Sequence, residues 1–345
     1  AAHLSCIVRA TGEAHRTNDI QSLAPALFAY ALYLEQDYHL HEAADALETM
    51  IRVGADRIQT SQMIAAWLRL GRVLRKQTEF DRAIAAYRES GRIAEVVGDQ
   101  ASALLSRIGQ CNVIHYRGNL AEAEGQWREV LASANRTDFQ EIKAQAYHGL
   151  GNILARRGQA HEGAPYLWRA YELYEDEAQQ LRTLNDLGIL LLSIGEVADA
   201  ERALTEVVRR ERATDNLANA KIELMNCASF RRDRVGFERW RERALDHVVD
   251  QLPNIRADFH LKAGVGLARF GNYQRAEHEL RRAQEIALAH GLHEFVFKIE
   301  QMRNGLHDCR ALDGLENTAV EPDRDGREAL RELSASLATL SSNAQ

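Results

Sequence analysis

Residues that could do acid–base or metal chemistry are scattered along this chain of 345 residues. His39 and His41 flank a predicted turn, and the acidic run at 175–177 has the character of a solvated helix end. The four cysteines lie far apart without a CxxC pair, which fits buried thiols in a reducing compartment rather than a disulfide framework. The sequence patterns of phosphate-binding loops, zinc proteases and serine hydrolases are absent. The sequence therefore predicts no enzyme activity, no cofactor and no metal site.

A helix–turn–helix unit over residues 67–97 recurs along the chain. Its two helices each carry a small residue, Gly71 and Ala83, so they can pack closely. Steps of 37–40 residues give a first-helix column of Ala31, Gly71, Cys111, Gly151, Gly188, Met225 and Gly264, and a second-helix column of Ala43, Ala83, Ala123, Gly163, Ala200, Phe237 and Ala276. The turn position recurs at Tyr38, Thr78, Gly118, Gly158, Gly195, Arg232 and Gly271. Such a unit cannot bury its apolar face alone, so it needs neighbours of the same kind.

Both small-residue columns break in the sixth repeat, at Met225 and Phe237. We expect this repeat to pack more loosely or at a different angle. We therefore expect Met225→Gly to destabilise the chain less than Gly151→Leu does. Gly264 and Gly266 are read as packing residues, because no strand precedes them as a dinucleotide-binding loop would require.

The spacing of Trp67, Leu70 and Gly71, followed by Ala83 and Tyr87, resembles the tetratricopeptide repeat (TPR). The 40-residue repeat length is similar to that of kinesin light chains, Rap-type proteins and the sensor half of maltose-regulator-type signalling ATPases. The resemblance implies an all-α, right-handed TPR-like solenoid of about seven repeats with a C-terminal capping helix. Four prolines and abundant Ala, Leu, Glu and Arg agree with a helical chain.

The predicted TPR superhelix covers residues 1–309. It has a partial repeat at 1–22, full repeats beginning near 23, 63, 103, 143, 180, 217 and 256, and a capping helix at 293–308. Residues 310–345 are predicted to form a polar linker and a weak helix at 327–340. That helix is expected either to fold back on the solenoid or to extend away.

In TPR proteins, the first helix of each repeat lines a concave groove. Transferring that register gives the candidate peptide-binding residues Arg69, Arg72, Arg75, Lys76, Asn112, His115, Tyr116, His148, Asn152, Arg156, Arg182, Asn185, Asn219 and Asn226. Asn112, Asn152 and Asn226 share the position at which peptide-binding TPR domains hold a peptide backbone. An asparagine suits this role because it offers both a donor and an acceptor. By contrast, the first repeat offers Phe28, Leu32 and Glu35, and the seventh offers Leu261, Lys262 and Val265.

The charge distribution suggests what the groove would bind. The chain has a net charge of −7, which argues against a generic nucleic-acid binder, yet positive charge gathers on the predicted groove. Arginine presents a planar fork that suits carboxylates. The expected partner is another protein or peptide, with acidic residues or a free C-terminus. No apolar run approaches the ~18 residues of a membrane span, and no signal peptide is visible, so we expect a cytoplasmic location.

Three functions fit these features. The first is an adaptor or scaffold that holds an extended acidic peptide. The second is a ligand-sensing module of a larger signalling or transcription regulator. The third is a Rap-like phosphatase, which the short stretch ahead of the first full repeat disfavours. Arginines are also common on solvent-exposed helix faces, where many pair with a nearby acid rather than with a ligand.

Overall fold

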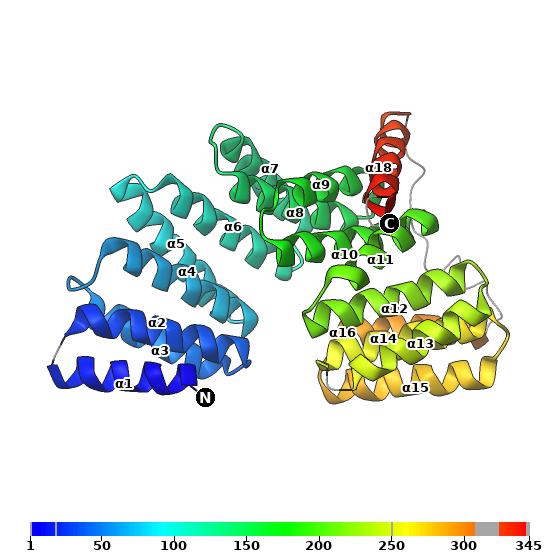
Figure 1. Ribbon diagram of the computed structural model, residues 1–345, viewed down its shortest axis with the longest axis horizontal. Helices are drawn as coiled ribbons and strands as arrows, with labels where there is room; N and C mark the ends of the chain where they lie inside the picture. The colour runs from blue at the N-terminus through cyan, green and yellow to red at the C-terminus, as the bar shows by residue number, and fades with distance from the viewer. Residues whose placement is uncertain (1, 18, 250, 308–323, 343–345) are drawn as a thin grey trace. The chain divides into compact units, whose positions relative to one another are not determined.

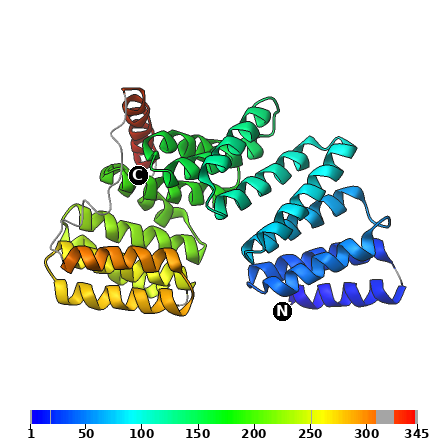
Figure 2. The same cartoon turned by 180° about the vertical axis from the view of Figure 1, so that it is seen from behind.

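The computed structural model describes residues 2–17, 19–249, 251–307 and 324–342. Over this part of the chain it contains 17 α-helices and no strand, which confirms the predicted all-α fold (Figure 1, and Figure 2 from behind). Of the predicted linker at 310–326, residues 310–323 lie outside the described residues, and residues 324–326 are helical instead. The chain forms two compact units, Ala1–Gly149 and Leu150–Gln345, hereafter the first and second units.

The helices follow one another as antiparallel pairs, the architecture of a TPR-like solenoid. The early helices are α1 (Ala2–Thr17), α2 (Ile20–Gln36), α3 (Leu40–Gly54), α4 (Thr60–Lys76), α5 (Phe80–Val97), α6 (Gln100–Tyr116) and α7 (Leu120–Ala134). The middle ones are α8 (Gln140–Arg156), α9 (Ala160–Leu173), α10 (Glu177–Ser193), α11 (Val197–Arg210), α12 (Thr214–Phe230) and α13 (Arg234–Val248). The last are α14 (Pro253–Arg269), α15 (Tyr273–Ala289), α16 (His293–His307) and α18 (Arg324–Ser342).

Glycines of the first-helix column mark close approaches between paired helices. A Cβ placed on Gly188 would lie 2.6 Å from Cγ of Leu204, and one on Gly151 would lie 2.8 Å from Cγ of Leu167. Gly163, in the second-helix column, faces the backbone oxygen of Gly151 at 2.8 Å by the same construction. Because native Cβ atoms are almost never this close to another heavy atom, only glycine fits there without movement. The predicted packing role of these columns is confirmed.

The recurring turn position adopts the left-handed backbone conformation in every repeat. Glycine occupies it in four repeats, for example Gly158 with φ of 78°. Tyr38, Thr78 and Arg232 adopt it with φ of 60°, 62° and 59°. A left-handed residue after a helix satisfies free backbone carbonyls and reverses the chain, which is why the position recurs with the repeat length.

The sixth repeat is tightly packed at these two positions, so the looser packing that was one of our two expectations is wrong. Met225 of α12 and Phe237 of α13 are both 0% exposed. Space for the Phe237 ring comes from Gly266 of α14, where a Cβ would lie 2.3 Å from the ring. A glycine in the next repeat thus compensates for the large residue in this one.

The two C-terminal helices pack in different places. Helix α16 contacts α14 and α15, as expected of a cap on the last repeat. Helix α18 contacts α9 and α11, and it buries Leu330, Leu333 and Leu337 in their apolar core. Of the two expected arrangements of this helix, the structure has the one in which it folds back.

Candidate functional site

A buried carboxylate collects three cations on the first helices of the first unit. Glu35 of α2 is 2% exposed. Its oxygens lie 2.5 Å from Nε of Arg69, 2.9 Å from Nε of Arg72 and 2.7 Å from Nζ of Lys76. The three cations are spaced i, i+3 and i+7 on α4, so they share one helix face. We call these four residues the basic cluster.

One carboxylate does not satisfy three cations. Burial alone would raise the pKa of Glu35, but the surrounding cations outweigh it and hold that pKa below its ordinary value. Burial lowers the pKa of Arg69 and of Lys76, and repulsion from the neighbouring cations adds to the decrease. Both sides of the ion-pair network therefore indicate a local shortage of negative charge.

Aromatic side chains lie beside the basic cluster. The guanidinium of Arg75 sits 4.8 Å from the ring centre of Tyr116, and His115 stacks on the same ring with centres 5.5 Å apart. Tyr116 is 58% exposed, so the ring is accessible. Asn112 is half-buried one turn earlier on α6. The structure thus brings the predicted residues of α4 and α6 onto the same side of consecutive first helices.

The second unit has a cavity of about 400 Å³ between its first helices. Its lining comes from α10 (Ile189, Leu192, Ser193), α12 (Glu223, Asn226, Phe230), α14 (Asp258, Leu261, Lys262, Val265) and α16 (Lys298, Gln301, Met302). The volume lies within the range of small-ligand and peptide-side-chain pockets. Mixed apolar and charged walls suit an amphipathic occupant.

Lys262 is the charged centre of this cavity. Its Nζ pairs with Glu223 and lies 2.6 Å from Oδ2 of Asp258. Burial raises the pKa of Glu223, whereas the two carboxylates raise the pKa of Lys262 in spite of its burial. Lys262 is therefore held charged by its acidic neighbours.

The repeat register placed Asn226 and Lys262 on the groove but did not group them with Glu223 and Asp258. The signal for Asp258 was present, because Asp258 and Lys262 have the i, i+4 spacing of a helical ion pair. Arg269 was also missed. Its guanidinium lies 3.7 Å from the ring centre of Phe230 and donates to Oδ1 of Asn226 at 3.2 Å.

The other predicted asparagines differ in accessibility. Asn185 is 3% exposed within α10, so it is not available to a ligand, contrary to the groove register. The buried Asn226 is occupied by Arg269, whereas Asn219 is half-buried. Asn152 donates from Nδ2 to Oδ2 of Asp186 at 3.2 Å. The register placed these residues on first helices, but it did not reveal which of them the neighbouring repeat covers.

The remaining predicted side chains are His148, Arg156 and Arg182. His148 is half-buried on α8, while Arg182 is exposed on α10. Arg156 lies 3.5 Å from Oε2 of Glu294 on α16, and both side chains remain largely exposed. An exposed pair at this distance is weak, so a ligand carboxylate could compete for Arg156.

Among the described residues, no group of three or more His, Cys, Asp or Glu side chains is arranged to hold a metal ion. Nor does any described helix combine the length and apolarity needed to cross a bilayer.

Comparisons with known proteins agree with the repeat architecture. The family model of the tetratricopeptide repeat matches residues 64–95. No curated protein sequence matches the chain. The apo quorum sensor NprR from B. thuringiensis has a similar structure, with a TM-score of 0.65, 10% identity, and coverage of 82% of each chain.

Two further solved structures share this fold. Apo RapI superposes with a TM-score of 0.60 and 11% identity, covering 76% of this chain and 97% of RapI. NprR in complex with its cognate peptide NprX gives a TM-score of 0.57 and 10% identity, covering 80% of this chain and 78% of NprR. At this level of identity the likeness concerns the fold alone. The chain therefore contains the tetratricopeptide repeat and folds as a TPR-like helical solenoid similar to those of Rap and NprR proteins.

Proposed function

We propose that this chain is a protein- or peptide-binding TPR module that holds an extended acidic segment on the first helices of its first unit. The observation that carries the proposal is the basic cluster, in which a single buried carboxylate faces three cations. A carboxylate from a partner would supply the missing negative charge. Arg72 is the most accessible cation, with a side chain that is 48% exposed, and it offers a fork for such a group.

Neighbouring side chains would hold the rest of the peptide. Asn112 is half-buried on α6, where its amide could pair with a backbone N–H and C=O. Tyr116 offers an exposed ring for an apolar peptide side chain. In the second unit, taken by itself, Asn152, Asn219 and Arg182 are candidates for peptide contacts of its own. The structure of NprR with its peptide NprX supports a peptide ligand by analogy of fold.

The test begins with selection of peptides from a random library on the full-length chain. A selected acidic peptide is then compared with its amide-matched version, in which Gln and Asn replace Glu and Asp. We expect the acidic peptide to bind at least tenfold more tightly, and to lose affinity as salt is added.

Arg72→Glu should weaken binding of the acidic peptide by roughly 1–2 kcal/mol and reduce its salt dependence, measured by isothermal titration. Arg88→Glu is the matched control, because Arg88 is an exposed arginine on the second helix α5. If Arg88→Glu abolished binding while Arg72→Glu bound like the parent, the first-helix face would not be the peptide site.

A second candidate function is ligand sensing by the cavity of the second unit. The specific observation is the cavity itself, where the half-buried Lys262 and Asp258 and the buried Glu223 lie among apolar walls. Apolar walls that carry charged side chains of both signs favour an amphipathic ligand. Ser193 is exposed at the cavity lining, so Ser193→Trp should fill the space without disturbing the core. If the cavity is a peptide site, peptides selected from the library should bind the parent chain but not Ser193→Trp. Equal binding to both would show that the cavity is not the peptide site.

A further inference from the structure

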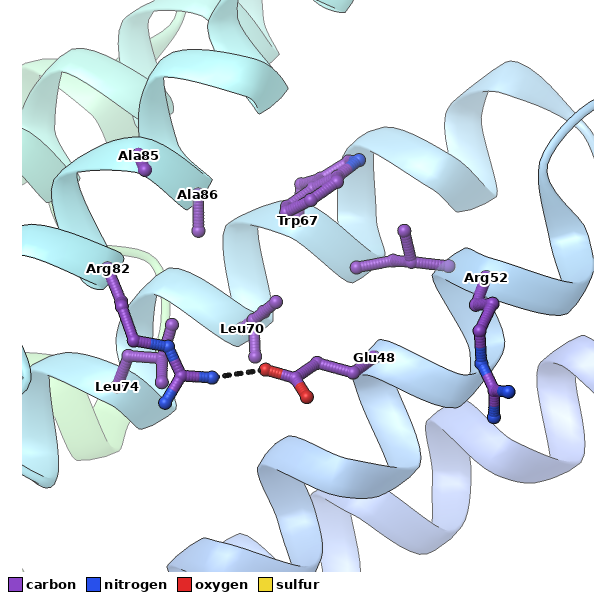
Figure 3. Close-up of a pocket in the computed structure, with 9 residues that line it drawn as sticks. Glu48, Arg52, Trp67, Leu70, Leu74, Arg82, Ala85 and Ala86 are labelled. Carbon is purple, nitrogen blue, oxygen red and sulfur yellow. Dashed lines mark hydrogen bonds and ion pairs between the residues drawn. The ribbon is translucent and has the colours of Figure 1, made fainter.

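A separate apolar pocket of about 350 Å³ opens between α3 and α5 of the first unit (Figure 3). Its floor is Trp67, Leu70 and Leu74 of α4, and its sides are Ile51 of α3 and Ala85 and Ala86 of α5. Leu70 and Leu74 are almost fully buried, but the larger Trp67 ring is only half-buried. We call this pocket the α3–α5 groove. Trp67, Leu70 and Leu74 each lie two residues before one of the three cations, which is about half a turn of an α-helix. The groove therefore lies on the side of α4 opposite to the basic cluster.

Charged side chains border the α3–α5 groove. Glu48 of α3 and Arg82 of α5 reach toward each other and form an ion pair (Figure 3). Arg52 also borders the groove, and no acid among the described residues forms a salt bridge with it. Arg82 also pairs with Glu79, so the two acids and two cations at this edge balance, and Arg52 is the cation that these ion pairs leave over.

The second unit shows what covers a groove of this kind. In the repeat register Gly71 corresponds to Gly188, so the floor residues Trp67, Leu70 and Leu74 correspond to Leu184, Leu187 and Leu191 of α10. These three leucines belong to the same apolar core as Leu330, Leu333 and Leu337 of α18. Helix α18 contacts α9 and α11, which correspond to α3 and α5.

The stripe on α18 has the i, i+3, i+7 spacing of an amphipathic helix laid into a groove. Its leucines are 9%, 3% and 1% exposed, so they are nearly removed from water. The α3–α5 groove has the same construction but no covering helix among the described residues.

We propose that the α3–α5 groove is a docking site for an amphipathic helix of a partner protein. That helix would present apolar side chains at i, i+3 and i+7 to Trp67 and Leu70. It would carry an acidic residue beside the stripe, opposite Arg52. The proposal is independent of the acidic-peptide site, because it uses the second helices and the opposite face of α4.

The experiment uses the full chain and a labelled peptide with the sequence of residues 324–342. This peptide presents a suitable leucine stripe. We expect saturable binding by fluorescence anisotropy. Ala85→Glu places a charge in the groove at an exposed position and should weaken binding at least tenfold. A version of the peptide with Ala329→Glu and Ser334→Glu, at positions that flank the stripe on its two sides, should bind more tightly, and Arg52→Glu should cancel that gain.

Arg202→Glu is the matched control, because Arg202 occupies the position of Ala85 in the α9–α11 pair. It should leave binding unchanged. If Arg202→Glu weakened binding and Ala85→Glu did not, the peptide would be displacing α18 from its own groove, and the proposal would be overturned. Absence of binding to the intact chain would overturn it as well. Sedimentation that revealed a dimer lost in Ala85→Glu would assign the groove to a second copy instead of a partner protein.

Discussion

Glu35 is the residue whose ionisation should matter most to the first unit. Its pKa lies below the ordinary value of 4.5, because the three cations outweigh the effect of burial. A carboxyl with a lowered folded-state pKa stabilises the protein above its unfolded pKa, and that stabilisation is lost as the pH falls through the folded value. The stability of the first unit should therefore fall as the pH drops below about 4.5.

Glu35→Gln should remove this part of the acid sensitivity. At neutral pH it should destabilise the chain by about 2 kcal/mol, less than for a fully buried pair because the cations are partly exposed. Urea unfolding followed at several pH values measures both effects. Glu89→Gln is the control, since Glu89 forms a more exposed i, i+3 pair with Arg92 and should cost less than about 1 kcal/mol. An unchanged pH profile in Glu35→Gln would assign the acid sensitivity to other carboxyls.

Core substitutions at Gly151 and Met225 should both be severe. Gly151→Leu forces a side chain against Leu167, which already lies 2.8 Å from where a Cβ would sit. Met225→Gly empties a site that is 0% exposed, so we expect a loss of about 3–5 kcal/mol from the cavity and the glycine together. Because Met225 is fully buried, we no longer expect Met225→Gly to destabilise the chain less than Gly151→Leu. Thermal unfolding of the two variants tests this, and a near-parental Met225→Gly would mean that the sixth repeat can collapse around the gap.

At the scale of the helix pair, a substitution at the turn position should change stability through backbone strain. Gly158 has φ of 78° and nothing within 4 Å of a Cβ placed on it, so Gly158→Ala tests backbone strain alone. It should cost about 1 kcal/mol. Thr78 has φ of 62°, so Thr78→Gly should stabilise by up to about 1 kcal/mol. Chemical denaturation measures the change in the free energy of unfolding for both variants. A loss of stability in Thr78→Gly would show that the threonine side chain contributes more stability than the strained backbone costs.

At the scale of the whole chain, α18 is part of the fold of the second unit. From the sequence alone, residues 310–345 are expected to contribute little to the core, so a chain ending at Arg310 is expected to remain folded and soluble. The three buried leucines of α18 change that expectation. Truncation at Arg310 should expose apolar surface on α9 and α11 and lower the melting temperature by roughly 5 °C or more.

Calorimetry and binding of an apolar dye to the truncated chain measure this effect. The first unit should keep its own transition, because α18 packs within the second unit. Unchanged melting together with no dye binding would mean that α18 rests on the surface without contributing stability.

The repeat length by itself determined the fold class, the helix pairs and the turn position. This was possible because a small residue between helices and a left-handed residue at a turn are local requirements, such as Gly188 and Gly158. Tertiary structure alone decided which polar groups pair. Glu35 with three cations, Arg269 with Asn226 and the burial of Asn185 all depend on how one repeat lies against the next. The position of α18 was undetermined for the same reason, since an amphipathic stripe specifies that a helix is covered but not by which surface.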